Sequence, residues 1–199
     1  MACCGAGVSP QFLEMSDLQS ARSVLRAATA PAHERVDRAF GHFDLTTATG
    51  YRNFLLAQAQ PLVTVEAAVD AFGPVTILPD WPQRRRAPLI AADLADFDVP
   101  MPAPEPLLLS SMEAALGAIY VLEGSRLGGA LLARNISMDL PGRFIRCPAA
   151  PKRWRGLIEV LDQILATPHQ RDAAVSAARA VFDLFWRSAR QHGRMPLVE

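Results

Sequence analysis

The residues most able to form an unusual site are the glycines of Gly124-Ser-Arg-Leu-Gly-Gly129, which interrupt a long apolar helical pattern. That pattern runs over about residues 110–137, with hydrophobic residues at three- and four-residue steps. Each glycine inside a helix costs about 1 kcal/mol relative to alanine, so the four glycines, with Gly117 included, put about 3–4 kcal/mol of helicity at risk. Gly117, Gly124 and Gly128 fall within roughly 40° of one another around the helix. Such a bare face suits both the close packing of a second helix and a flat ligand against the backbone.

The histidines are the next candidates for chemistry. They stand at positions 33, 42, 169 and 192, and no two have the spacing of a metal-binding pair. Asp37 follows His33 by four residues, on the same helical face. A metal-bound imidazole commonly donates its second N–H to a carboxylate, although the same spacing also occurs in ordinary surface pairs. In an all-helical chain, a single histidine that faces a glycine-lined helix favours heme as the ligand.

The elements that must position these residues are all predicted to be helices. Alternating strand patterns are absent, and phosphate-binding loops and hydrolase motifs are absent as well. Helical patterns cover five further ranges: 17–40, 46–72, 83–97, 151–164 and 168–185. Pro31 and Pro61 are expected to kink or divide the first two, and the proline-rich segment 99–106 is expected to be extended. Thr167 is expected to cap the last helix, with Pro168 as its first residue.

Composition limits the class of protein. The chain has 199 residues, of which 50% are hydrophobic and 20% charged, and this suits one globular domain. We expect a leader over residues 1–16, an all-α domain over 17–192 and a tail over 193–199. A formal net charge of zero gives no general attraction to nucleic acid or to an anionic membrane. Without a signal peptide or a membrane-spanning stretch, and with only three cysteines, the expected location is the cytoplasm.

Three segments, in this order, resemble the heme oxygenase family. Leu25 to Asp37, which contains His33, resembles its proximal helix, and Tyr51-Arg-Asn-Phe54 through Glu66 resembles its second helix. Gly117 to Arg134 resembles the distal helix, in the version carried by bacterial enzymes that accompany bacteriophytochromes. The resemblance extends over about residues 18–187. It implies a helical bundle that holds heme between a proximal and a distal helix.

The resemblance also implies roles for individual residues. His33 would bind the heme iron, with Asp37 holding its other ring nitrogen. Gly124, Gly128 and Gly129 would lie over the opposite face of the heme, where O₂ binds. Ser125 occupies a position at which animal-type members carry an aspartate that anchors a chain of water molecules. The remaining heme contacts implied are Arg26 and Tyr120 at the propionates, Phe182 on the pocket wall, and Arg134.

The activity implied is the cleavage of heme b, which is both substrate and prosthetic group, to biliverdin, CO and Fe²⁺. The expected isomer is biliverdin IXα. O₂ and an external electron donor (ferredoxin, flavodoxin or another reductase) are required, and a bacteriophytochrome is the expected acceptor of the product. Two alternatives stay open. One is a non-catalytic heme sensor or carrier, for which the Cys147-Pro148 dipeptide is weak support, and the other is a thiaminase-like or di-iron enzyme on a related fold.

Overall fold

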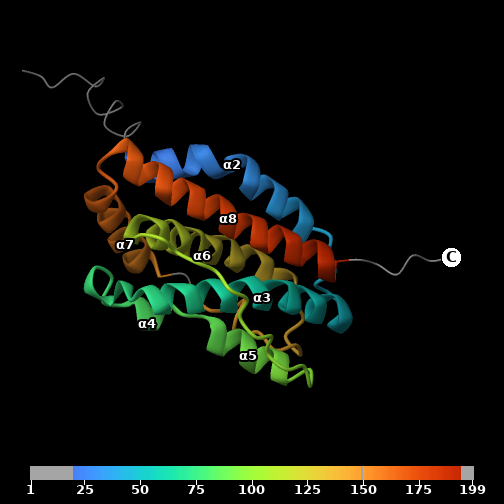
Figure 1. Ribbon diagram of the computed structural model, residues 1–199. Helices are drawn as coiled ribbons and strands as arrows, with labels where there is room; N and C mark the ends of the chain where they lie inside the picture. The colour runs from blue at the N-terminus through green and yellow to red at the C-terminus, as the bar shows by residue number, and fades with distance from the viewer. Residues whose placement is uncertain (1–19, 149, 194–199) are drawn as a thin grey trace, which may run out of the picture.

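All regular secondary structure in the part of the chain that the computed structural model describes, residues 20–148 and 150–193, is helical (Figure 1). The long helices are α2 (Ala21–Phe40), α3 (Ala48–Phe72), α6 (Met112–Leu132), α7 (Pro151–Ile164) and α8 (Pro168–His192). Shorter ones are η1 (Pro74–Thr76), α4 (Trp81–Arg84), α5 (Ala87–Ala95) and η2 (Ala133–Asn135). The prediction of an all-α fold is therefore confirmed.

Several predicted boundaries agree with local capping chemistry. Thr47 caps α3 by accepting from the Gly50 N–H, and Thr167 caps α8 in a full capping box with Gln170. The segment 99–110 contains no helix, as its prolines indicated. Pro31 and Pro61, however, divide neither α2 nor α3, which are continuous through these residues.

The helix predicted over 83–97 is wrong as a single element. The structure has α4 and α5 instead, separated by Arg85, which is extended, and Arg86. The cause is a buried carboxylate. Glu66 of α3 accepts the backbone N–H groups of Arg86 (2.6 Å) and Ala87 (3.1 Å) and so supplies the N-terminal cap of α5.

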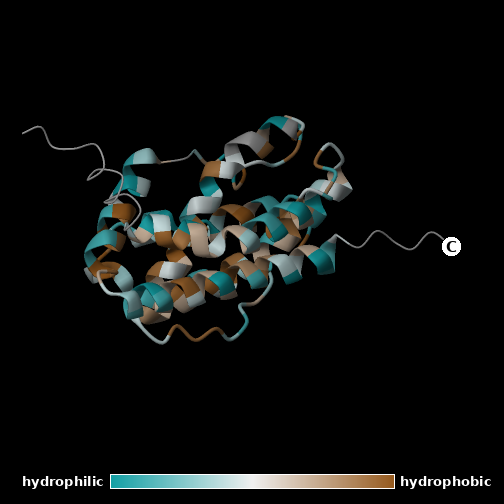
Figure 2. Ribbon diagram, turned by 90° about the horizontal axis from the view of Figure 1, so that it is seen from above, coloured by the Kyte–Doolittle hydropathy of each residue, from teal (hydrophilic) through white to brown (hydrophobic). Residues whose placement is uncertain are grey.

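Helix α8 is the element around which the others pack. It contacts α2, α3 and α6, and Figure 1 shows it crossing between α2 and α6. Its buried face includes Val175, Ala178, Phe182 and Phe185. Figure 2 shows the apolar stretches of the helices turned mainly toward their neighbours and the polar stretches mainly outward. One core thus unites the described helices.

Gly117 permits the closest of these approaches. A Cβ at this position would collide with the Ala174 carbonyl oxygen of α8. For this glycine, close helix packing is therefore the correct reading of the glycine stripe.

Two further expectations concern the ends of the chain and membranes. The predicted leader, 1–16, and most of the tail, 193–199, lie outside the described residues. Among the described helices, none combines the length and the apolar character needed to span a bilayer.

Candidate functional site

His33 lies on α2 with one ring nitrogen held and the other available. Its Nδ1 is 2.9 Å from Asp37 Oδ2, and its side chain is 59% exposed. The ring meets Phe182 of α8 edge to face, with centroids 5.6 Å apart. Because Nδ1 is paired with the carboxylate, Nε2 is the ring nitrogen left for a metal. The side chain is thus oriented on two sides, and its Nε2 has no partner among the described residues.

Gly124 and Gly128 give α6 an open face. A Cβ at Gly128 would meet nothing within 4 Å, and one at Gly124 would only reach Trp154 Cη2 at 4.0 Å. Tyr120, one turn before Gly124 on the same face, packs on the Trp154 ring with centroids 5.8 Å apart. This face therefore changes along the helix, from the tight contact at Gly117 to unfilled space at Gly128.

Arg22 and Arg26 of α2 approach this same face of α6 at Tyr120. Burial raises the pKa of Tyr120, and the charges of Arg22 and Arg26 oppose that shift because they lie near its hydroxyl. Arg26 precedes His33 by two helical turns, so it shares a face of α2 with the histidine. The structure thus sets Arg26 and Tyr120 near each other on two helices that both pack on α8, with His33 two turns further along α2 and Gly124 and Gly128 further along α6.

Two other predicted residues lie elsewhere. A Cβ at Gly129 would point toward Ile145, with its carbonyl oxygen at 3.7 Å, so the argument from open space applies only to Gly124 and Gly128. Arg134 is an exposed residue of η2, about 20 Å along the helix axis from Tyr120. Arg134 and Tyr120 are too far apart to bind one carboxylate together.

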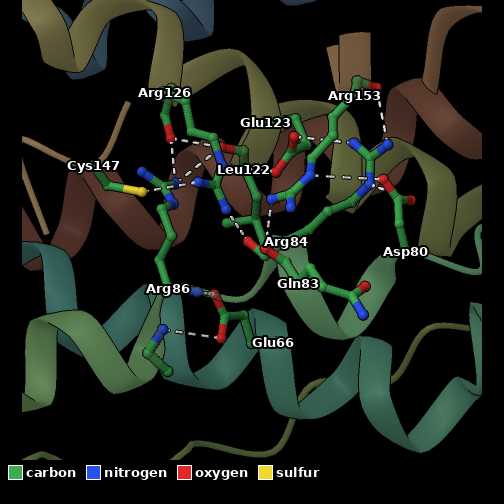
Figure 3. A network of polar contacts seen from close by, with 12 residues as sticks. Glu66, Asp80, Gln83, Arg84, Arg86, Leu122, Glu123, Arg126, Cys147 and Arg153 are labelled. Atoms are coloured by element: carbon green, nitrogen blue, oxygen red, sulfur yellow. Dashed lines mark hydrogen bonds and ion pairs between the residues drawn. The ribbon is translucent and has the colours of Figure 1, made fainter. Parts of the chain in front are cut away.

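Behind the open face, α6 is anchored by a buried ionic network (Figure 3). Glu123 accepts from Arg84 Nη1 at 3.0 Å and from Arg126 Nε at 2.9 Å, and all three side chains are at most 6% exposed. Arg126 also donates to the Arg84 carbonyl oxygen. Since Glu123 directly precedes Gly124, these contacts fix the backbone at the start of the open segment.

Ser125, an exposed residue on the flank of α6, is joined to this region by hydrogen bonds. Its hydroxyl donates to the Leu122 carbonyl oxygen at 2.8 Å and accepts from Arg86 Nη2 at 2.6 Å. Arg86 Nη2 also donates to Leu122 O at 2.9 Å, and its guanidinium lies over the Phe144 ring. Burial first, and the charge of Arg126 second, lower the pKa of Arg86 to about 10. Ser125 therefore links a buried arginine to a helix carbonyl.

Sequence reasoning missed Arg22 and the whole arginine network. Arg22 could have been found because it precedes Arg26 by one turn on the same face. The run Arg84-Arg85-Arg86 and the acidic residue Glu123 inside an apolar helix were also visible. A run of charges usually indicates a solvated surface, however, and here two of the three arginines are buried.

The comparisons with known proteins begin with the fold. The crystal structure of the NO- and CO-bound heme oxygenase of Neisseria meningitidis superposes with a TM-score of 0.77 and covers 91% of this chain and 96% of its own. Its sequence is 21% identical, so this match establishes the fold alone. The class defined is thus the single-domain, all-helical heme oxygenase fold.

The family follows from sequence. The heme oxygenase family model matches residues 91–191. A heme oxygenase of Xanthomonas campestris pv. campestris is 32% identical over 151 residues, which are 73% of this chain and 90% of the relative. The heme oxygenase PigA of Pseudomonas aeruginosa is 28% identical over 136 residues, 63% of this chain and 66% of PigA. The chain belongs to the heme oxygenase family.

Membership makes this protein an oxidoreductase that cleaves heme, and confirms the family and the activity expected from the motifs. It also decides against the two alternatives, the non-catalytic heme carrier and the thiaminase-like or di-iron enzyme. Heme as substrate, with O₂ and electrons, follows from the family.

Proposed function

We propose that this enzyme holds heme between His33 on α2 and the Gly124–Gly128 segment on α6, and converts it to biliverdin IXα, CO and Fe²⁺. The observation that carries the proposal is the pairing of two features. A histidine keeps Nε2 free while Asp37 holds Nδ1, and the nearby distal helix lacks side chains where a flat ligand needs space. When bound and reduced, the heme iron supplies the O₂ chemistry; the protein supplies position.

The residues present fit a heme in this place. His33 is exposed in the free protein, as a ligand for an incoming metal must be, and Phe182 offers an apolar edge beside it. Arg22, Arg26 and Tyr120 provide two cations and a hydroxyl for two carboxylates at one end. Propionates held at this end would determine which edge of the macrocycle lies under the glycines, and we assign the α-meso edge to that position.

The distal helix is held so that little besides backbone faces the ligand. The hydroxyl proton of Ser125 is engaged by Leu122 O, so this group positions the helix through Arg86 and is not the proton donor. Gly128 leaves room for bound O₂. We assign Gly129 to the part of α6 that packs beside Ile145, not to the open face. We assign Arg134 to the end of the helix, away from Tyr120, where the carboxylates would bind.

The wider setting follows from the Gly-Ser-x-Leu-Gly-Gly motif and its bacterial phytochrome-associated version. We propose a cytoplasmic enzyme that receives electrons from ferredoxin, flavodoxin or a related reductase and supplies biliverdin to a bacteriophytochrome. Mixing the turnover product with an apo-bacteriophytochrome tests the last step. Formation of the red-absorbing holoprotein supports this step. The step is refuted if the turnover product gives no holoprotein while authentic biliverdin gives it in a parallel reaction.

The reaction itself is tested by adding hemin, then reductant and O₂, and by separating the biliverdin isomers chromatographically. We expect loss of the Soret band and formation of the α isomer. Arg26→Gln should increase the proportion of other isomers, because one propionate contact is removed. A wild-type product other than the α isomer would refute the assigned orientation while leaving heme cleavage intact.

A further inference from the structure

A cavity of about 860 Å³ lies on the side of the molecule away from the glycine face of α6. It is bordered by α4, the start of α5, Cys147 and the N-terminus of α7. Arg126, which reaches it from α6, is two residues from both Gly124 and Gly128, or about 200° around the helix. The cavity is therefore separate from the proposed heme site, and its volume is ordinary for a small-molecule site.

The lining of this cavity is cationic and apolar. Its charged residues are Arg85, Arg126, Lys152 and Arg153, and among the described residues no carboxylate lines it. Four prolines, Leu89 and Ala150 make up most of the rest. A concave surface of this kind favours an anion that carries an apolar body.

Three of the cations have unused capacity for an anion. Arg126 is 7% exposed, and among the described residues its Nη1 has only Cys147 Sγ, at 3.4 Å, as acceptor. A thiol sulfur is a weak acceptor. Lys152 is exposed and makes no hydrogen bond or ion pair with any described residue. Arg153 is more engaged, since Nε lies 3.9 Å from Asp80 Oδ2 and Nη1 donates to Gln83 O at 2.7 Å, but its Nη2 has no acceptor among the described residues and can also bind an anion.

The N-terminus of α7 supplies backbone N–H donors to the same cavity. Helix α7 begins at Pro151 with Ala150 as N-cap, and no side chain caps it. Its first free N–H groups therefore belong to the same residues, Lys152 and Arg153, whose side chains line the cavity. Side-chain and backbone donors thus converge on one concave site.

We infer that this cavity is a second ligand site, which binds a small organic anion with a phosphate or carboxylate group on an apolar body. The anionic group lies against Lys152, Arg153 and the start of α7, and the apolar body lies against the prolines. Arg126 on the cavity wall holds Glu123 next to Gly124, so the ligand contacts the network that fixes the distal helix.

Lys152 is the only lysine in the 199-residue chain, and this makes the site testable with pyridoxal 5′-phosphate. The aldehyde carbon forms an imine with Lys152 Nζ, water leaves, and borohydride then reduces the imine to a stable amine that peptide mass spectrometry locates. The N-terminal α-amine is the internal reference. Near neutral pH an ordinary lysine offers roughly a hundredfold less neutral amine than the α-amine, because its pKa is about 10.4 rather than about 8.

We expect Lys152 to be labelled faster than the α-amine, with saturation at submillimolar reagent and competition by millimolar inorganic phosphate. Pyridoxal, which lacks the phosphate, should lose at least tenfold in rate at Lys152. Arg153→Gln should reduce labelling by the phosphate reagent similarly, whereas Arg155→Gln, on the same helix but outside the cavity lining, should not. Circular dichroism checks that both variants fold.

Equal labelling of Lys152 by pyridoxal and its phosphate would overturn the inference. Labelling that inorganic phosphate does not reduce would overturn it as well, and this measurement needs no variant. Because none of these readouts involves heme, their outcome is independent of the proposed heme site.

Discussion

Two glycines of α6 should respond to the same substitution with opposite signs. At Gly117, an alanine Cβ would collide with the backbone carbonyl of Ala174, and a carbonyl cannot move aside as a flexible side chain can. At Gly128, the added methyl group would meet nothing within 4 Å. Gly117→Ala is therefore expected to destabilise the protein, and Gly128→Ala to stabilise it.

The magnitudes follow from two terms. Alanine gains about 1 kcal/mol of helix propensity over glycine at either site. At Gly128 nothing opposes this gain, so the free energy of unfolding should rise by about 0.5–1 kcal/mol. At Gly117 overpacking costs about 1–3 kcal/mol, and more where α6 and α8 must separate, so the net effect is a loss. In a chain of this size 1 kcal/mol corresponds to about 2–4 °C in Tm.

Thermal unfolding of the heme-free protein, followed by circular dichroism, measures both effects. A heme titration completes the test: Gly128→Leu should weaken heme binding at least tenfold, although a Cβ at this position meets nothing within 4 Å in the protein itself. If Gly117→Ala were as stable as the wild type, the close-packing interpretation would be wrong. If Gly128→Leu bound heme normally, the proposed distal face would be wrong.

Four further outcomes are expected. His33→Ala should abolish the axial-ligand signature of the heme spectrum without changing apoprotein stability by more than about 0.5 kcal/mol, and Asp37→Asn should weaken heme binding by about 10–100-fold; an unchanged His33→Ala spectrum would remove His33 as the ligand. Glu123→Gln should cost about 3–5 kcal/mol in urea unfolding, because it leaves buried guanidinium groups without their carboxylate, and a loss below 1 kcal/mol would contradict this. Burial raises the pKa of both tyrosines, Tyr51 and Tyr120, so native protein at pH 10 should show little tyrosinate absorbance. The stability that their burial contributes is present below pH 10 and falls as the pH rises above it. Half-ionisation of the tyrosines at pH 10 would refute the burial of both rings.

The sequence predicted the fold well because helical periodicity and capping are local. Thr47 and Thr167 cap the helices that their positions indicated, and the long elements lie where the hydrophobic spacing placed them. The break between α4 and α5 was missed because its cause is not local. The carboxylate of Glu66, twenty residues earlier, receives the N–H groups that would otherwise continue a helix.

The candidate site was predictable to a similar extent. The spacing of His33 and Asp37, and of Tyr120, Gly124 and Gly128, placed each set on one helical face. The structure pairs His33 with Asp37 and sets Arg22 and Arg26 of α2 near Tyr120 of α6, and the roles of these residues toward heme stay predictions. The structure also distinguishes Gly117 from Gly124 and Gly128, which a helical wheel cannot do. The backbone of α8 packs against Gly117 but not against the other two. Arg86 was missed for the same reason: its partners, Leu122 and Ser125, are distant in sequence.

The two sides of α6 have complementary roles. A helix that must leave one face bare for a ligand gives up both helix propensity and side-chain contacts on that face. Glu123 and Arg126 on the opposite side, and Ser125 on the flank, are bound by the buried residues Arg84 and Arg86. None of the three arginine side chains comes within 4 Å of a Cβ placed at Gly124 or Gly128. Buried ion pairs add little net stability compared with apolar packing, but they fix geometry, since a lost partner is costly. The arginine network is therefore best understood as the device that keeps a glycine-rich segment in one position, and its rupture should loosen the heme site before it unfolds the bundle.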